Sequence, residues 1–179
     1  MHSILKKIRP GREETNKVNS LVKKFLSELK KSIPGVKPEL AGSFAKNTWL
    51  SGNHDIDVFI KFHYQKYKDK DISALLAKQL ANYTIMHGSR DYFQVQYRGY
   101  LFELIPVLAI THAEQAKNIT DISPLHAIWV KRHIKSYADD IRLAKQFLRA
   151  NSLYGAESYI KGFSGYLVEV LTIHYRGFL

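Results

Sequence analysis

The sequence predicts an α+β fold, in which a mixed β-sheet is flanked by helices and followed by a small helical region. Up to residue 110, runs rich in β-branched and aromatic residues alternate with stretches of helical periodicity. Two of these runs flank Arg98-Gly99, which is the pattern of a β-hairpin. After that point the apolar residues recur mainly at helical spacing. We therefore expect one domain over residues 1–110 and a helical one over 111–179.

The composition narrows the class of partner. With 179 residues the chain can bury a full core, and its net charge of +11 favours a polyanion such as RNA, DNA or an anionic membrane surface. A basic solvated surface is the alternative. The absence of cysteine excludes disulfides and thiolate metal sites and suits a reducing cytoplasm, where we expect the protein. No apolar run approaches a membrane span, and the first residues lack a signal-peptide core.

The first predicted element is a helix over residues 12–32, where apolar side chains recur at i, i+3 and i+4 until Pro34-Gly35 ends it. A strand over 36–41 then leads into Gly42-Ser43, and Ser43 is expected to cap a short helix over 43–50. The next elements are expected over 55–62 (strand), 69–83 (helix), 84–87 (strand), 92–97 and 100–108 (hairpin strands). Because proline lacks an N–H donor, Pro106 is expected to end the last ladder.

The second half of the chain predicts helices. Residues 111–122 are polar and are expected to be irregular. Ser123-Pro124 is typical of a helix start, with serine as N-cap and proline in the first turn. Helices are expected over 125–134, 139–150 and 163–178, the last of them capped by Ser164 or Gly162, with a break over 151–156.

Asp55 and Asp57 begin a predicted strand and form the first candidate site. Side chains alternate along a strand, so the two carboxylates share one face, while Ile56 and Val58 point into a core on the other. Neighbouring carboxylates repel each other, and a hard cation such as Mg²⁺ between them removes that cost. The spacing therefore indicates a divalent-metal site.

Gly42-Ser43 lies shortly before these aspartates. The start of a helix presents unpaired N–H groups and can bind a phosphate, and Lys46 in the first turn would add charge. An ordinary helix cap with a solvent-facing lysine is the alternative.

Glu103 is a third candidate, because it stands alone in the otherwise apolar run 101–108. An unpaired buried charge is costly, so Glu103 requires a partner, a metal or an active site, unless it faces solvent on an edge strand. Two aspartates plus a third carboxylate on a nearby strand is the arrangement that two-metal phosphoryl transfer requires. The third carboxylate can then hold a metal and accept the proton of the attacking group.

The order Gly-Ser, a short spacer and Asp-hydrophobic-Asp-hydrophobic resembles the signature of the nucleotidyltransferase superfamily that includes DNA polymerase β. In more detail, the chain resembles the archaeal-type (class I) CCA-adding enzymes, the tRNA nucleotidyltransferases. The segments that carry this resemblance are 42–59, 123–129, 144–157 and 161–167. The resemblance covers nearly the whole chain and implies a palm-like nucleotidyltransferase head over 1–110 and a helical neck over 111–179.

The resemblance also implies roles for individual residues. Asp55 and Asp57 would be the metal-binding pair and Glu103 the third carboxylate, so that all three are expected to be catalytic and to bind the metal. The residues expected to bind the incoming nucleotide are Gly42, Ser43, Lys46, His126, Lys145 and Tyr154. Without the resemblance, a helix-capping His126, a solvent-facing Lys145 and a packed Tyr154 are the ordinary interpretations.

The chain departs from the family's usual pattern in three ways. That pattern is Glu-x-Asp followed by Asp, whereas here Asp55-x-Asp57 is followed by Glu103, which is one methylene longer. Lys46 stands where arginine is usual, so the bidentate fork is lost. The chain ends at Leu179, and the body and tail domains that grip the tRNA acceptor arm have no counterpart in it.

The resemblance implies an Mg²⁺-dependent enzyme, with Mn²⁺ as an alternative metal, that transfers NMP from ATP or CTP to an RNA 3′-hydroxyl. The expected reaction is tRNA 3′ CCA addition, or a truncated or split form of it. The expected partners are tRNA or another RNA 3′ end, nucleoside triphosphates, and either a separate chain that supplies the body and tail or further copies of this chain, with no membrane.

Two other functions stay open. One is a small stand-alone nucleotidyltransferase that modifies a protein, an antibiotic or tRNA ends. The other is a catalytically weakened domain that binds nucleotide or RNA through its charge of +11.

Overall fold

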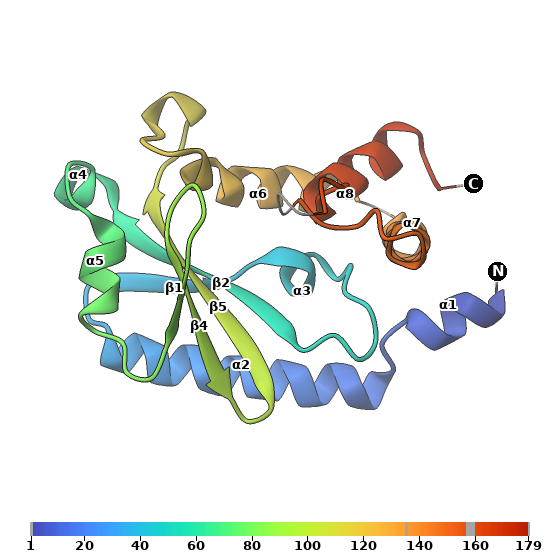
Figure 1. Cartoon of the computed structure of the whole chain (residues 1–179), viewed down its shortest axis with the longest axis horizontal. Helices are drawn as coiled ribbons and strands as arrows, with labels where there is room; N and C mark the ends of the chain where they lie inside the picture. Colours follow the sequence, from blue (N-terminus) through green and yellow to red (C-terminus); the bar gives the residue numbers. More distant parts are fainter. Residues whose placement is uncertain (1, 135, 157–159, 179) are drawn as a thin grey trace.

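The computed structural model describes residues 2–134, 136–156 and 160–178. Its centre is a five-stranded sheet in the order β1-β2-β5-β4-β3 (Figure 1). The strands are β1 (Val36–Leu40), β2 (Asp55–His63), β3 (Thr84–Met86), β4 (Tyr92–Tyr97) and β5 (Tyr100–Ala109). β2 and β5 pair in parallel, and the other neighbouring strands pair antiparallel. The predicted α+β fold with a mixed sheet is confirmed.

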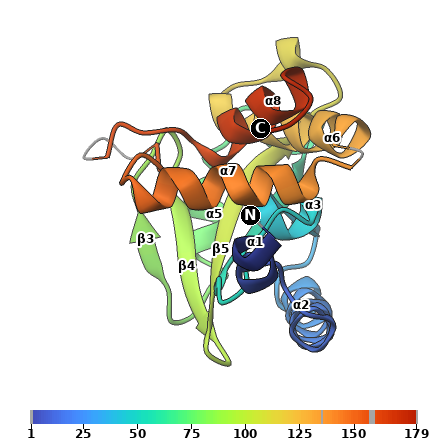
Figure 2. The same ribbon diagram turned by 90° about the vertical axis from the view of Figure 1, so that its right-hand side faces the viewer.

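Helices cover both faces of this sheet. The helices are α1 (His2–Ile8), α2 (Arg12–Ser32), α3 (Gly42–Lys46), α4 (Tyr64–Tyr67), α5 (Ile72–Ala77), α6 (Ser123–His133), α7 (Ala138–Ala150) and α8 (Gly165–His174), with 3-10 turns at Ala113–Gln115 and Ile119–Ile122. α2 runs along one face, and α6 and α8 lie on the opposite side (Figure 1). α7 packs against both α1 and α8, and Figure 2 shows it side-on. No helix among the described residues has the length and apolar character needed to cross a membrane.

The main core lies between the sheet and α2. Ile56, Val58 and Ile60 of β2 are fully buried there, as the strand alternation predicts. Phe102 of β5 stacks on Phe25 of α2 with ring centroids 3.8 Å apart. Each such side chain contributes about 1.5–3 kcal/mol by leaving water. The opposite face of β2 and β5 carries Asp57 and Glu103 together with a smaller apolar cluster that includes Phe59 and Val107.

Several element boundaries differ from the predictions. The helix expected over 69–83 is confined to α5, where the Asp71 side chain accepts from the Ala74 N–H. The prediction that Pro106 ends its strand is wrong, since β5 continues to Ala109. Because β4 pairs with β5 only as far as Leu104, the N–H that proline lacks is not needed for a hydrogen bond to β4. α1 was not predicted.

Of the serine N-caps predicted at Ser43 and Ser164, one is wrong and one is confirmed. Ser43 is not the N-cap of the short helix: Ala41 takes that position, and α3 ends at Asn47 in the left-handed conformation instead of continuing to residue 50. Ser164 does cap α8, since its Oγ accepts from the Leu167 N–H at 3.1 Å.

Candidate active site

The three predicted carboxylates lie on the same face of the sheet, opposite α2. Asp57 of β2 is paired directly with Glu103 of the parallel strand β5. Asp55 precedes Asp57 by two positions and lies on the same face at the exposed start of β2. On the other side of Glu103, Gln94 of β4 donates from Nε2 to the Glu103 Oε1 at 2.8 Å. The register of three strands thus assembles a row of oxygen-bearing side chains.

Asp57 has the most perturbed acid–base chemistry of the three. Burial raises its pKa to about 7, and the neighbouring charge of Glu103 adds to the increase, while Lys46 acts in the opposite direction. Asp57 also shares a hydrogen bond with Glu103. Two carboxylates this close repel each other, and a cation between them would relieve that repulsion.

This donor set suits a hard divalent cation, because it consists of closely spaced carboxylate oxygens. Within residues 2–134, 136–156 and 160–178, no three His, Cys, Asp or Glu side chains converge as a ready-made metal site. The structure therefore provides the ligand atoms and the repulsion between Asp57 and Glu103, and the metal assignment of Asp55, Asp57 and Glu103 stays a prediction.

Gly42 is required beside Asp57 for two reasons. Its φ of +56° lies in the left-handed region, and a Cβ on Gly42 would fall 1.6 Å from the Asp57 Oδ2. The same turn is joined to β2 by the backbone, since the Ala41 N–H donates to the Asp57 carbonyl at 2.8 Å. The Gly-Ser turn thus approaches the carboxylates as closely as a backbone can.

An open pocket of about 220 Å³ lies next to this turn. Its lining residues are Gly42, Lys46, Asp57, Phe59, Ile105, Ser123, His126, Ala127 and Tyr166. The His126 ring stacks on Tyr166 with centroids 4.2 Å apart and planes 8° from parallel. Burial, and then the charge of Lys46, lower the pKa of His126, so its neutral form is favoured. The pocket thus contains a carboxylate, an ammonium and a neutral imidazole.

The two predicted nucleotide-binding lysines are both held by one carboxylate, Glu169 of α8. Lys46 donates from Nζ to the Glu169 Oε2 at 2.5 Å, and Lys145 donates from Nζ to Oε1 at 3.2 Å. Thr48 donates from Oγ1 to the same Oε1 at 2.8 Å. Lys145 is 2% exposed, so the alternative of a solvent-facing lysine is wrong.

The remaining predicted contacts lie outside the set of described residues that line the pocket. Ser43 is inside α3, and Lys145 belongs to the buried cluster behind Lys46. Tyr154 forms an isolated bridge with Phe163, and the Arg149 guanidinium lies 5.0 Å from its ring centroid. Glu157, which ends one of the predicted family segments, lies outside the described residues.

Sequence reasoning missed Gln94, Tyr166 and Glu169. Glu169 had a usable signal, because it is the one charged residue between Gly165 and Ile173 in an apolar stretch, as Glu103 is in its strand. The argument that a lone buried carboxylate needs a partner applied to both. Gln94 and Tyr166 had no such signal, since neither residue type is unusual at its position.

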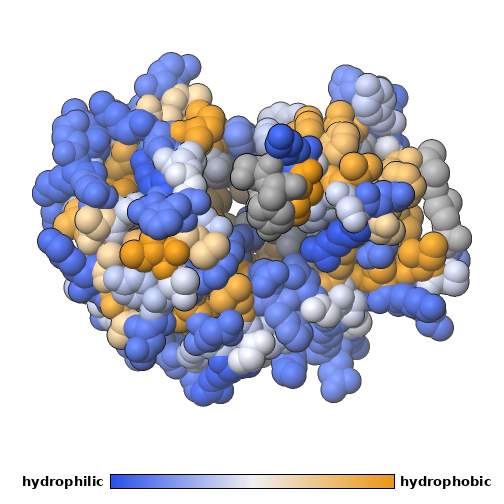
Figure 3. Space-filling view, in the orientation of Figure 1, coloured by the Kyte–Doolittle hydropathy of each residue, from blue (hydrophilic) through white to orange (hydrophobic). Residues whose placement is uncertain are grey.

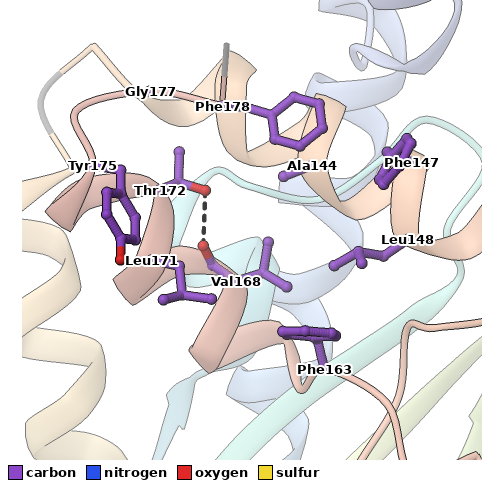
Figure 4. Close-up of a pocket in the computed structure, with 10 residues that line it drawn as sticks. All are labelled: Ala144, Phe147, Leu148, Phe163, Val168, Leu171, Thr172, Tyr175, Gly177 and Phe178. Carbon is purple, nitrogen blue, oxygen red and sulfur yellow. Dashed lines mark hydrogen bonds between the residues drawn. The ribbon is translucent and has the colours of Figure 1, made fainter.

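A second cavity, of about 300 Å³, lies between α7, α8 and the chain after α8 (Figure 4). We call it the apolar groove. Its lining residues are Ala144, Phe147, Leu148, Phe163, Val168, Leu171, Thr172, Tyr175, Gly177 and Phe178. Phe147 is 54% and Tyr175 73% exposed, and apolar side chains gather over these C-terminal helices in Figure 3.

The mixed sheet, with carboxylates on two parallel strands beside a glycine turn, defines the class of nucleotidyltransferase folds. The solved structure of an H336N mutant of the Cid1 poly(U) polymerase bound to MgATP superposes with a TM-score of 0.71, covering 97% of this chain and 54% of that one. At 12% sequence identity, this likeness concerns the fold alone.

The chain belongs to the nucleotidyltransferase domain family, whose model matches residues 22–141. The model of the second domain of tRNA nucleotidyltransferases matches residues 139–179. Nucleotidyltransferases of this kind use a divalent metal together with a nucleoside triphosphate.

Curated relatives of this chain are named as CCA-adding enzymes. A CCA-adding enzyme of Nanoarchaeum equitans is 39% identical over 173 residues, which cover 94% of this chain and 43% of the relative. A CCA-adding enzyme of Methanosarcina barkeri is 37% identical, covering 98% of this chain and 41% of the relative. The resemblance predicted from the sequence is confirmed, and the chain spans less than half the length of these relatives.

Proposed function

We propose that this chain is the catalytic part of a CCA-adding type of nucleotidyltransferase, which moves NMP from CTP or ATP to an RNA 3′-hydroxyl, most directly that of tRNA. The observation that carries the proposal is the pairing of Asp57 with Glu103 on the face that also presents Asp55, beside Gly42 and the pocket. The curated relatives, each named a CCA-adding enzyme, support tRNA as the acceptor.

In this proposal, Asp55, Asp57 and Glu103 hold the divalent ion, Mg²⁺ or Mn²⁺. The bound ion supplies activation of the attacking hydroxyl and neutralises charge on the triphosphate. Gln94 supports the role of Glu103, because its amide donor fixes one carboxylate oxygen and leaves the other toward Asp57.

The nucleotide would occupy the pocket, with its phosphates toward Gly42 and Ser43. Lys46 supports this orientation because its ammonium lies in the pocket wall, and neutral His126 offers a ring donor without adding charge. Lys145 and Tyr154 are proposed as further nucleotide contacts on the family resemblance, and Lys145 would act from behind Lys46.

The experiment uses tRNA transcripts that end before, within and after CCA. Each is incubated with a single nucleoside triphosphate and Mg²⁺ or Mn²⁺, and the products are separated at nucleotide resolution. We expect transcripts that lack CCA to gain C and then A, with no gain on complete transcripts. The matched control is the Asp55→Ala plus Asp57→Ala double variant, which should add nothing.

Two outcomes would replace the proposal. Transfer of labelled NMP to a protein or small-molecule acceptor, with tRNA unchanged, would favour a stand-alone nucleotidyltransferase. No metal-dependent transfer, with equal RNA binding by the wild-type chain and the double variant, would favour a binding module that relies on the net charge of +11.

The division of the chain is part of the same proposal, with a head over 1–110 and a helical neck over 111–179. The apolar groove supports a partner for the neck, because exposed apolar side chains line it and because the relatives carry more than half of their length in segments that this chain does not match. We propose as its occupant protein equivalent to those segments. A cytoplasmic location, suited to a chain without cysteine, completes the proposal.

The occupant can be tested by light scattering of the purified chain across a range of concentrations. We expect a monomer, whose tRNA extension increases when the missing segments of a relative are added as a separate chain. A dimer that dissociates in Phe147→Asp would instead identify a second copy as the occupant. A monomer that adds CCA at the full rate of an intact relative would refute the need for a partner.

A further inference from the structure

Glu169 is a buried acid with an unusual set of partners. It is 0% exposed and lies in α8, whose other residues from Gly165 to Ile173 are apolar or uncharged. Its two oxygens accept from Lys46 at 2.5 Å, from Thr48 at 2.8 Å and from Lys145 at 3.2 Å. A packing role alone would be met by leucine, so the carboxylate must be explained by what it holds.

The cluster of these four residues, which we call the Glu169 cluster, carries an excess of positive charge. Two ammonium groups share one carboxylate, so the sum is +1 when all three are ionised. Burial lowers the pKa of Lys145. Lys46 is the one member of the cluster that also lines the pocket beside Asp57 and His126. The excess charge therefore reaches the pocket wall through Lys46.

The Glu169 cluster is not needed to attach the C-terminal helices to the segment after α3. Arg142 of α7 does this independently: its Nη2 donates to the Asn47 carbonyl at 2.6 Å, and its Nε donates to the Trp49 carbonyl at 3.0 Å. Arg142 is itself paired with Asp139 at 2.6 Å. Two separate connections thus join the C-terminal helices to the region of α3 and the segment after it, and only the one through Glu169 ends at the pocket.

Lys46 has a competing partner within the pocket. Lys46 and Asp57 both line this pocket, so the ammonium and the carboxylate face the same cavity. A lysine head on a flexible stem moves to the nearest carboxylate that is free to pair. Without Glu169, the ammonium of Lys46 would be drawn to Asp57, where it would occupy carboxylate oxygens and leave the position from which it can meet a phosphate.

We propose that Glu169 is a positioning residue of the nucleotide site, which holds the Lys46 ammonium in the pocket wall and keeps it from pairing with Asp57. This inference rests on the proposed function, and it deepens that function by assigning the control of Lys46 to α8, outside the sheet that carries the carboxylates. Glu169 acts through Lys46 and does not itself meet the substrate.

The test measures KM for the nucleoside triphosphate and kcat on the full chain with Mg²⁺. We expect Glu169→Gln to raise KM by about tenfold and to change kcat less, because a supporting side chain of this kind typically contributes a factor of about 10–100. In the Lys46→Met background the same change should have no further effect on KM, since the residue through which Glu169 acts is gone. Glu169→Asp keeps the charge but shortens the side chain, and it should raise KM by a smaller factor.

The control is Arg142→Lys, which weakens the connection from α7 to the segment after α3. It should lower the melting temperature and leave KM unchanged. An unchanged KM in Glu169→Gln, or in Glu169→Asp if the first variant does not fold, would overturn the inference. So would an equal rise of KM in Arg142→Lys, because the Glu169 cluster would then be only structural. Absence of transfer by the wild-type chain would instead overturn the proposed function.

Discussion

Asp57 and Glu103 lie side by side with like charge on the open face of the sheet, whereas Lys46 and Lys145 share the opposite charge of Glu169 under α8. The first pair has a neutral neighbour, Gln94, and burial together with the charge of Glu103 raises the pKa of Asp57 to about 7. In the second region, the Glu169 oxygens accept hydrogen bonds from Lys46, Thr48 and Lys145. The carboxylates are therefore arranged for a ligand from outside the chain, and the Glu169 cluster is complete without one.

Because of this contrast, we expect the loss of a charged side chain to affect activity in the first region and stability in the second. Removing a carboxylate from the sheet takes away repulsion and a ligand atom, so activity falls while stability is kept. Removing the carboxylate of the Glu169 cluster leaves buried ammonium groups without a counter-charge, so stability falls.

The largest effect is expected for Asp57→Asn. The rate of NMP transfer should fall by at least about 10³-fold, since a bound metal contributes several kcal/mol and about 1.36 kcal/mol is a factor of ten. The melting temperature should stay the same or rise, because the repulsion from Glu103 is relieved. Transfer assays with Mg²⁺ and thermal unfolding of the same preparation check both. A clear loss of melting temperature would contradict the comparison.

The next effect is expected for Glu169→Leu, which should lower the free energy of unfolding by about 3 kcal/mol. The value lies at the lower end for a broken buried pair because Thr48 can still accept from Lys145, with Nζ–Oγ1 at 3.0 Å. Lys145→Met should cost less, since the pair of Lys46 with Glu169 remains. Urea denaturation of both variants measures the order, and a larger loss in Lys145→Met would refute it.

A smaller effect on stability is expected for Gly42→Ala. The left-handed backbone costs about 1–2 kcal/mol for a residue with a Cβ, and the clash with Asp57 adds to that cost. The matched control is Gly52→Ala, which also has a positive φ but finds no atom within 4 Å of its Cβ. We expect both to lower stability and only Gly42→Ala to abolish transfer. Equal transfer rates would show that the close approach to Asp57 is dispensable.

The smallest effect is expected at His126. Burial and the charge of Lys46 both lower its pKa below the ordinary value, so the folded state favours the neutral ring, and protonation must wait until the pH falls below that value. NMR titration of the ring should show this low pKa, and Lys46→Met should raise it. A His126 that titrates at its ordinary value in the wild type would mean that the charge of Lys46 does not reach it.

The sequence allowed much of the fold and the chemistry of one site to be predicted. Alternation along β2 identified its core face and its carboxylate face, because that pattern is local to one strand. The range of α2 was predicted fully, since its apolar spacing and its stop at Pro34-Gly35 are both local signals. The α4–α5 region was predicted less well, because its helix depends on one cap at Asp71 rather than on a long apolar stripe.

The sequence alone was enough to identify the three acidic residues. It placed Asp55 and Asp57 on one side of a strand, and it showed Glu103 as a lone charge in an apolar run. Only the tertiary structure decided which groups meet. Glu103 faces Asp57 because β2 and β5 pair in parallel, and Lys46 meets Glu169 across 123 positions of the chain because α6 packs against both α3 and α8. Periodicity reports the direction of a side chain within its own element, whereas its partner depends on how separate elements pack, and no local pattern records that.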